Sequence, residues 1–444
     1  MNDPATESAD HAATRPYRPR WLLLAPFLSR PPALTRRQWQ VLGLVSVATR
    51  FDQYDRALFA MALPKIQQSL AISEANVGYL GSVVRLGALP AFLIASAADR
   101  LGRRRVLLFT IVAYTLCTGA TALAPNAASF VAFQFFAHIF TAADALLAVV
   151  VIAEELDASV RGWGIGALLA IQSCGVGVAA IFFPLVEWLG LGWRALYVVG
   201  LVPLLMIARW RRALPETARF ERRRAQRDFD AQLMPAAAPI AALARAYPGR
   251  FAAVAAVTFV FAVGGAAADF LAPKYLQEGH GWDPGQVALL YILGGAVAII
   301  GSPFAGRLSD RVGRKPVTIA LGIASIALVV AFYGAAGPWL APLWIAMVFV
   351  AMGHDVLQQS FGAELFPTSY RSTAAGARGI VATVGAALGL VLESVLYRAS
   401  GSHWTATSLL MLSAGAGPFI VAFAFPETAG RSLEEIAPEA AERA

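Results

Sequence analysis

The sequence predicts an all-α membrane protein with twelve transmembrane helices in two parallel six-helix repeats. Hydrophobic residues make up 58% of the 444 residues and charged residues 14%, which is too apolar for a soluble domain. Twelve apolar runs of about 20 residues occur, each long enough to cross roughly 30 Å of hydrocarbon as a helix. Motifs of the first half also return in the second half after about 210 residues.

The helices are expected in order along the chain, with boundaries set by the apolar runs. The first six span 40–62, 77–97, 106–124, 128–152, 163–186 and 193–212, and the last six span 251–272, 285–306, 316–336, 339–361, 373–396 and 404–425. These runs divide the chain into a cytoplasmic N-terminal tail (1–38), a six-helix bundle (39–212), a cytoplasmic central loop (213–250), a second six-helix bundle (251–425) and a cytoplasmic C-terminal tail (426–444).

Arginines gather in alternate loops, and this sets the expected topology. They cluster between helices 2 and 3, between helices 8 and 9, and in the central loop, for example at Arg100, Arg307 and Arg219. The positive-inside rule places these loops and both termini in the cytoplasm. The net charge of +8 therefore indicates topology and not nucleic-acid binding, and we expect a multi-pass protein of the cell inner membrane.

A repeat of about 210 residues relates the two halves. The stretch ADRLGRRR, which contains Asp99, returns as SDRVGRKP, in which Asp310 lies 211 residues later. Glu154 returns as Glu364 after 210 residues, and each half ends in a PET motif. Parallel repeats with a substrate site near the membrane midplane are the architecture of one large class of secondary transporters.

These motifs resemble those of the major facilitator superfamily over nearly the whole chain. GRLSDRVGRK, from Gly306 to Lys315, has that family's loop signature in full, while the first copy has Ala95 where the family has glycine. The two pairs of Glu and Arg seven residues apart, and the PET motifs, look like the branch of sugar porters and organic-ion transporters. The resemblance implies the major facilitator fold, transport by alternating access, and a monomer.

The charged residues of the loop signatures and of the two Glu and Arg pairs are expected to act in gating. An aspartate in the signature can pair with arginines and offset a helix terminus. In the family this cluster latches the halves in one state and releases them in the other, and simple membrane anchoring by the arginines is the alternative. The expected gating residues are Asp99, Arg100, Arg103, Glu154, Arg161, Asp310, Arg311, Arg314, Glu364 and Arg371.

The stretch RFDQYDRALF, residues 50–59, places four charges in the first apolar run. A charged residue at the bilayer centre costs about 2.5 to 3.5 kcal/mol, so four cost on the order of 10 kcal/mol unless they are paired or hydrated. Asp52, Asp55 and Arg56 share one arc of the helix, and Asp52 and Arg56 have the i, i+4 spacing of an ion pair. We expect this arc to face an aqueous cavity, with Arg50 pointing away.

Proton coupling is expected at carboxylates in this cavity. The DQYD motif resembles the signature of two aspartates in helix 1 of aromatic-acid proton symporters, and a carboxylate in a partly dry cavity can exchange a proton near the working pH. Asp52, Asp55 and Asp144 are the proton-coupling candidates. The alternative is a static, charge-neutral network of Asp52, Asp55, Arg56 and Arg85 that only fixes helices 1 and 2.

Polar side chains within the predicted helices are the substrate-binding candidates. The arginines among them can bind a substrate carboxylate through two parallel hydrogen bonds. The candidates are Arg85, Gln172, His354, Gln358 and Arg378. Gln172 matches a sugar-contacting glutamine of the sugar porters. Helix 7, however, lacks their paired glutamines and helix 10 lacks the sugar-porter tryptophan, which favours an organic anion over a sugar.

The sequence thus predicts a secondary transporter that takes up a small organic anion, such as an aromatic or other carboxylic acid, together with protons. The alternatives are a proton-coupled sugar or polyol porter, a drug or metabolite efflux antiporter, and a transporter-like solute sensor. An enzyme is not expected, because the sequence has no GxxxxGK loop, HExxH motif or metal-ligand cluster. No cofactor is expected, and the expected partners are the substrate, protons and the lipid bilayer.

Overall fold

A computed structural model describes residues 19, 22, 31–211, 237–431 and 433–438, and helices account for all the regular structure of this part. The N-terminal half comprises α1 (Arg36–Ser69), η3 (Glu74–Asn76), α2 (Val77–Leu86), α3 (Ala91–Leu101), α4 (Arg103–Ala122), α5 (Ala127–Glu155), α6 (Ala158–Trp188) and α7 (Gly192–Arg211). The C-terminal half comprises α9 (Ala237–Ala246), α10 (Pro248–Lys274), η4 (Tyr275–Gly279), α11 (Pro284–Val312), α12 (Arg314–Gly334), η5 (Gly337–Trp339), α13 (Leu340–Glu364), η6 (Thr368–Tyr370), α14 (Arg371–Ser400), α15 (His403–Ser413), α16 (Ala416–Ala424) and α17 (Leu433–Ile436). The all-α prediction is confirmed, and each predicted membrane run falls on one helix or on a divided pair.

The helices are those of a multi-pass membrane protein. Ten helical segments of the described chain are long and apolar enough to cross a bilayer. α1 is not among them, because four charges from Arg50 to Arg56 interrupt its apolar surface, and the apolar part of α7 is shorter. With α1 and α7 included, the described chain has the twelve predicted membrane helices.

Two of the predicted helices are each divided into two. α2 and α3 are separated by a turn that contains Gly87 and Pro90. Proline lacks a backbone N–H and therefore interrupts the helical hydrogen bonding. A Cβ added at Gly87 would lie 2.6 Å from the carbonyl oxygen of Phe135, so glycine lets α5 pack closely at this break. A second break separates α15 from α16.

The two halves make the same turn at the loop signature. Gly102 joins α3 to α4 with a φ of 97°, and Gly313 joins α11 to α12 with a φ of 117°. These angles lie in a region that residues with a side chain rarely adopt, so glycine is favoured at both positions. The internal repeat therefore extends to the backbone geometry.

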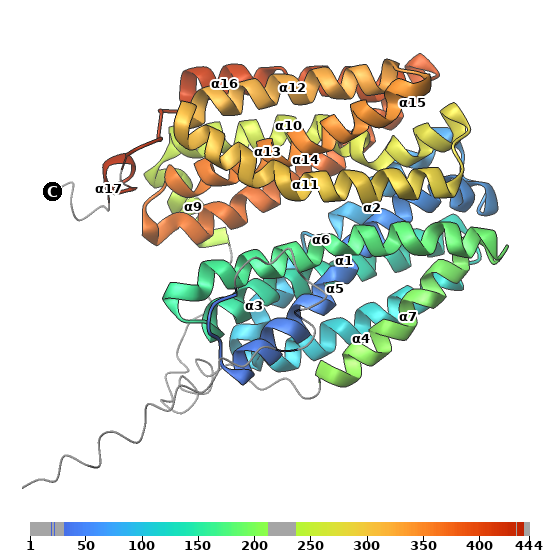
Figure 1. The fold of residues 1–444 in the computed structure, drawn as a ribbon, viewed down its shortest axis with the longest axis horizontal. Helices are drawn as coiled ribbons and strands as arrows, with labels where there is room; N and C mark the ends of the chain where they lie inside the picture. Colours follow the sequence, from blue (N-terminus) through green and yellow to red (C-terminus); the bar gives the residue numbers. More distant parts are fainter. Residues whose placement is uncertain (1–18, 20–21, 23–30, 212–236, 432, 439–444) are drawn as a thin grey trace, which may run out of the picture.

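The two halves lie side by side and meet through three helix pairs (Figure 1). α1 packs on α10, α2 on α14, and α6 on α11. The halves approach closely at Gly78 of α2, where an added Cβ would overlap the Leu390 carbonyl oxygen of α14 and lie 2.6 Å from Ser394 Oγ and 2.7 Å from Glu393 Oε2. Backbones of opposite halves approach this closely because a small residue stands at the crossing.

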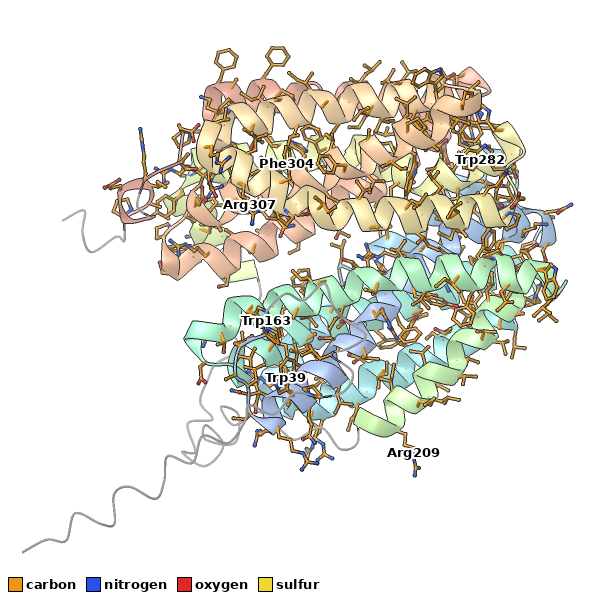
Figure 2. All side chains as sticks on the ribbon, viewed as in Figure 1. Trp39, Trp163, Arg209, Trp282, Phe304 and Arg307 are labelled. Atoms are coloured by element: carbon orange, nitrogen blue, oxygen red, sulfur yellow. The ribbon has the colours of Figure 1, made fainter. Side chains whose placement is uncertain are left out.

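The two ends of the molecule differ in the side chains that they carry. We call one end the loop-arginine end: it holds the Gly102 and Gly313 turns, and Figure 2 shows Trp39 and Arg307 toward it. We call the opposite end the vestibule end: it holds η3, η4 and, in Figure 2, Trp282. The sequence-distant contacts between the halves described below lie between the middle of the molecule and the vestibule end.

Candidate functional site

Charged side chains of α1 and α5 meet in the middle of the N-terminal half. Arg56 Nε lies 3.4 Å from Asp52 Oδ2, which confirms the predicted i, i+4 pair. Asp52 Oδ1 lies 3.8 Å from His138 Nδ1 of α5. The Arg56 side chain is 47% exposed, whereas those of Asp52 and His138 are largely buried. Asp52 therefore lies between a cation that faces open space and an imidazole inside the bundle.

An ion pair beside this group joins the two halves. Arg85 Nη2 of α2 lies 3.7 Å from Asp269 Oδ2 of α10, and Arg85 also interacts electrostatically with Asp52 and Arg56. The Asp269 side chain is 84% exposed although it lies within a membrane-spanning helix. Because its partner belongs to the other half, the open space beside Asp269 lies between the halves. We call Asp52, Arg56, Arg85, His138 and Asp269 the central charge cluster.

Of the predicted arc only Arg56 is exposed, and Asp55, like Asp52, is buried. It is buried beside Tyr114 of α4, and its Oδ1 has no hydrogen-bond partner. Three residues along a helix turn the side chain by about 60° from Asp52, and this is enough to direct it into the contact between α1 and α4. Asp52 and Arg56 thus border different surroundings from Asp55.

Asp144 lies behind Asp52 and not in the open space. It is buried and accepts a hydrogen bond from Thr110 Oγ1 at 3.1 Å. Asp52, Asp144 and Thr110 line one small pocket between α1, α4 and α5, together with Thr49 and Tyr114. Two of the three predicted proton-coupling carboxylates are therefore neighbours inside the N-terminal half.

The polar residues of α13 divide between the bundle interior and its open side. His354 is buried, packs edge-on against Phe261 with ring centroids 4.2 Å apart, and contacts Gln358. Asp355, which the sequence did not single out for binding, is exposed and pairs with Arg378 at 3.4 Å. Adjacent helical residues point about 100° apart, so only one of the two is expected to face outward, and in the structure this is Asp355 and not the substrate-binding candidate His354.

At the loop-arginine end, Glu154 pairs with Arg103 at 3.0 Å and not with Arg161 as predicted. Arg103 is buried and also donates to the carbonyl oxygen of Ala98 at 3.2 Å. The Gly102 turn places Arg103 at the start of α4, directly against the end of α5, whereas Arg161 is exposed. The side chains of the predicted gating residues Asp99 and Arg100 lie outside the described residues.

The C-terminal half repeats this pair and adds the PET motif to it. Arg314 Nε lies 2.7 Å from Glu364 Oε1, and Asp310 pairs with Arg314 at 3.2 Å. Thr428 of the PET motif donates to Glu364 at 2.6 Å. Arg371 donates to backbone carbonyl oxygens instead of pairing with Glu364 as predicted. The equivalent pair in each half is therefore formed by the arginine after the glycine turn.

Glu427 of the PET motif caps α12. Its carboxylate accepts hydrogen bonds from the backbone N–H groups of Arg314 at 2.9 Å and Lys315 at 3.1 Å. Burial raises the pKa of Glu427, but the backbone donors outweigh burial and hold that pKa below its usual value. The group that offsets this helix terminus is thus Glu427, whereas the sequence suggested Asp310, and Arg311 is exposed.

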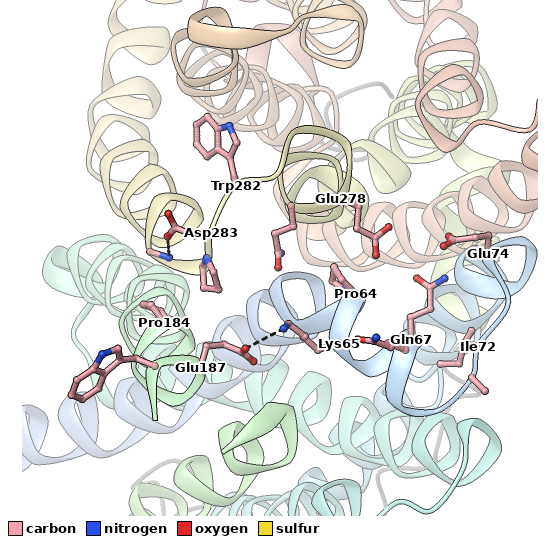
Figure 3. A pocket seen from close by; sticks show the side chains of 16 residues that line it. Pro64, Lys65, Gln67, Ile72, Glu74, Pro184, Glu187, Glu278, Trp282 and Asp283 are labelled. Atoms are coloured by element: carbon pink, nitrogen blue, oxygen red, sulfur yellow. Dashed lines mark hydrogen bonds and ion pairs between the residues drawn. The ribbon is translucent and has the colours of Figure 1, made fainter. Parts of the chain in front are cut away.

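A pocket of about 1030 Å³ lies between the halves at the vestibule end (Figure 3). We call it the vestibule. Lys65 and Glu187 line it and pair at 3.4 Å. At its edge, Lys274 Nζ of α10 contacts Gln67 Oε1 at 2.6 Å and Glu74 Oε2 at 3.1 Å. Lys274 belongs to the C-terminal half and its two partners to the N-terminal half, so these contacts bridge the halves.

The sequence favours a hydrogen-bonded structural role for His138 over a functional one, and it assigns no site role to Asp269 or Lys274. Their partners come from helices that are distant in sequence, so no spacing pattern reveals the contacts. The sequence feature that could have identified them is an isolated polar residue in an apolar run. Such a residue is costly in a membrane and therefore indicates a functional site. Gln172, a predicted substrate-binding residue, is half-buried on α6.

Comparison with known proteins gives a consistent result. The Major Facilitator Superfamily model matches residues 45–390 and 254–443. The cis,cis-muconate transport protein of Acinetobacter baylyi is 26% identical over 359 residues, covering 79% of this chain and 86% of the relative. The niacin transporter NiaP of the same organism is 24% identical over 432 residues, covering 90% of this chain and 96% of the relative. The crystal structure of a D-xylose-proton symporter superposes with a TM-score of 0.73 and 17% identity over 89% of this chain and 99% of that chain, which shows a shared fold.

Proposed function

The chain belongs to the Major Facilitator Superfamily, and on that premise we propose that this membrane transporter, which is not an enzyme, takes up a small organic anion together with protons. The substrate class is an aromatic or other carboxylic acid. Transport proceeds by alternating access, in which the space between the halves opens first to one side of the membrane and then to the other.

The observation that carries the proposal is the ion pair between Arg85 and Asp269. Its distance of 3.7 Å exceeds the 2.7 to 2.9 Å or so of a charge-assisted hydrogen bond, and Asp269 faces the open space. A substrate carboxylate that enters this space can therefore replace Asp269 at the Arg85 guanidinium. Arg56, which is half exposed, supplies a second cation nearby.

The names of the relatives support an acid, and aromatic side chains pack the halves together next to the Arg85 and Asp269 pair. Phe59 of α1 and Phe270 of α10 meet edge to face across the halves with ring centroids 5.2 Å apart. Phe270 follows Asp269 directly, and Phe59 lies three residues after Arg56. Both rings are buried, so they pack the halves together beside the proposed site and are not themselves exposed to a substrate. The relatives are named for niacin and cis,cis-muconate, which are both carboxylic acids, and this supports an acid over a sugar.

Asp52 is the proposed proton carrier. It is buried between the half-exposed Arg56 and the buried His138, so Arg56 balances its charge in this state, and its proton exchanges with water when Arg56 moves away during the transport cycle. If the substrate is a monoanion, cotransport of one proton is electroneutral. The pH difference then drives uptake, with about 1.4 kcal/mol for each pH unit.

The two ends of the molecule are proposed to face opposite sides of the membrane. The arginine-rich loops support a cytoplasmic location of the loop-arginine end and both termini, with the vestibule end outside. The polar contacts between the halves at Lys274 then close the outer side, and the structure corresponds to an inward-facing state of a monomer in the inner membrane.

Uptake into proteoliposomes tests the function. Labelled aromatic acids, aliphatic acids and sugars are supplied with an imposed pH difference, an imposed voltage, or neither. We expect accumulation of an acid that depends on the pH difference. Accumulation of a sugar without any acid contradicts the proposed substrate class, and acid uptake that ignores the pH difference contradicts proton coupling.

A further inference from the structure

A second group of titratable side chains lies at the vestibule end, apart from the central charge cluster. His403 begins α15 and is buried between two carboxylates. Its Nδ1 lies 2.5 Å from Glu393 Oε1 of α14, and its Nε2 lies 3.0 Å from Glu74 Oε2 of η3. His403 and Glu393 belong to the C-terminal half and Glu74 to the N-terminal half. We call these three residues the His403 cluster.

The geometry of the His403 cluster requires an extra proton. A neutral imidazole carries one N–H and one lone pair, and an ionised carboxylate only accepts hydrogen bonds. With a neutral ring and two ionised carboxylates, one of the two contacts would set a lone pair against a lone pair. Both contacts become hydrogen bonds when one proton is added, either on the ring or on a carboxylate. The closed arrangement therefore holds one proton more than the neutral ring and two carboxylates do.

The surroundings of Glu393 also indicate that the His403 cluster holds one added proton. Its side chain is 0% exposed, and its second oxygen, Oε2, is buried without a hydrogen-bond partner. Oε2 faces Gly78 of the other half, where an added Cβ would lie 2.7 Å away. A buried carboxylate that lacks donors is costly when it is ionised, and a proton within the cluster reduces this cost.

The other charged and titratable groups around His403 are few. On α14, Tyr397 stacks on the His403 ring with the centroids 4.1 Å apart. On α12, Tyr333 stacks on Trp404, which borders His403, and it also interacts electrostatically with Glu393. On α10, Lys274 pairs with Glu74 at 3.1 Å and with Glu278 at 2.5 Å, so its charge is already shared by two carboxylates. Beyond them, Arg398 lies over the Tyr79 ring. One added proton brings the local charge closer to balance.

We propose that Glu74, His403 and Glu393 form a proton-binding site at the vestibule end, and that a proton bound there stabilises the state in which the two halves are closed at this end. The site is distinct from Asp52. Water reaches it through the vestibule, because Glu74 lines that pocket and its side chain is 41% exposed (Figure 3). The proposal rests on the proposed function only for the side of the membrane that supplies the proton.

The direction of the effect follows from which residues move together. When the halves separate at the vestibule end, Glu74 leaves with the N-terminal half, and His403 loses one of its two carboxylates. The open state therefore binds the proton more weakly than the closed state does. Because the closed state holds more protons, its population falls as the pH rises, by at most about tenfold for each pH unit when one proton is involved.

A distance measurement on the full-length protein in lipid nanodiscs tests the site without any substrate. Spin labels are placed at exposed positions of the two halves near the vestibule, Gln68 and Ser400, after Cys117 and Cys174 have been replaced by serine. We expect short distances to dominate at low pH and a growing population of long distances as the pH rises. A distance distribution that does not change with pH overturns the proposal.

Four variants locate the proton in the same measurement. Glu393→Gln and Glu74→Gln each remove one carboxylate, and we expect the pH dependence of the distances to disappear in both. Glu278 contacts Lys274 but not His403, so Glu278→Gln is the matched control and is expected to keep the pH dependence of the distances. Asp52→Asn is also expected to keep the pH dependence of the distances, although this substitution is expected to abolish proton-driven uptake.

The opposite results overturn the site. The site is overturned if Glu393→Gln and Glu74→Gln both keep the wild-type pH dependence of the distances. It is also overturned if Asp52→Asn loses this pH dependence. Glu74 is half exposed in a short turn, so Glu74→Gln gives an answer even if Glu393→Gln does not fold. A failure of acid uptake in proteoliposomes bears on the proposed function and leaves these distances unaffected.

Discussion

Asp52 and Asp55 lie three residues apart on α1 and have different neighbours. Both are buried, but Asp52 contacts the half-exposed Arg56 and His138, whereas Asp55 lies beside Tyr114 of α4. A coupling carboxylate must exchange its proton with water in at least one state of the transport cycle. Both residues are buried, but only Asp52 pairs with the half-exposed Arg56, which reaches the open space, so the two residues are expected to differ in function.

Asp52→Asn is expected to abolish accumulation of substrate against its gradient, because the amide cannot carry a proton. Exchange of labelled for unlabelled substrate, which needs no net proton movement, should persist. Both are measured in proteoliposomes with and without a pH difference. Asp157→Asn, at an exposed position before α6, is the matched control. Accumulation at the wild-type rate in Asp52→Asn would show that another group carries the proton.

Arg85→Lys is expected to weaken substrate binding while preserving the charge, because lysine cannot bind a carboxylate through two parallel hydrogen bonds. Loss of a hydrogen bond to a charged group costs about 1.5 to 3 kcal/mol, which corresponds to a rise in KM of about ten- to a hundredfold. The KM for uptake is measured against that of Arg398→Lys, whose guanidinium lies over Tyr79 near the vestibule. An unchanged KM in Arg85→Lys contradicts its role in binding.

At the scale of helices, the contact between α2 and α14 decides how closely the halves approach. Gly78→Ala is expected to hold the vestibule end apart, because the new Cβ would overlap the Leu390 carbonyl oxygen and crowd Ser394. Transport should fall, and a cysteine at Gln68 should react faster with a water-soluble thiol reagent. Gly177→Ala on α6, where an added Cβ meets open space, is the control. Wild-type transport in Gly78→Ala would show that α2 and α14 need not meet.

The start of α12 provides a prediction about stability. Glu427→Gln is expected to destabilise the protein by about 0.5 to 1 kcal/mol, because a neutral amide offsets the helix terminus less well than a carboxylate. The pKa of Glu427 is lowered in the folded protein, so this stabilisation is present above the unfolded pKa and is lost as the pH falls through the folded pKa.

Thermal unfolding in detergent at pH 7 and at successively lower pH measures this effect. The difference between wild type and Glu427→Gln should shrink as the pH falls. Asp310→Asn, which affects an exposed ion pair with Arg314 but no cap, should have a smaller effect at every pH. An equal loss in both variants would contradict the capping role of Glu427.

At the scale of the whole molecule, the halves are joined at the vestibule end and an open space lies beside Asp269. A cysteine at Gly265 of α10, where an added Cβ meets open space, is therefore expected to react with a membrane-impermeant thiol reagent from one side. With the proposed topology, this side is the cytoplasm, so inside-out vesicles should react faster than right-side-out vesicles. Gln68→Cys in the vestibule should show the opposite preference. Equal rates from both sides would contradict a closed vestibule end.

The fold was predictable from local patterns because each pattern acts within one segment. Apolar runs of membrane length predict the helices, and the pair of residues Asp52 and Arg56 predicts its own contact because both lie on one helix turn. The 211-residue offset between Asp99 and Asp310 predicts two related halves. The Gly102 and Gly313 turns bear this out in the backbone.

The contacts between segments were decided only by the tertiary structure. The partner of Glu154 is Arg103 and not Arg161, and the bridge of Lys274 to Glu74 spans 200 residues. Nothing in the sequence fixes which residues of two packed helices meet, because that depends on the rotation and crossing point of each helix. By itself, the sequence determined a two-fold repeated membrane transporter with costly charges in its first helix. The tertiary structure decided that Asp52 and Asp55 are both buried, that only Arg56 of this group faces the open space, and that His403 lies between carboxylates of opposite halves.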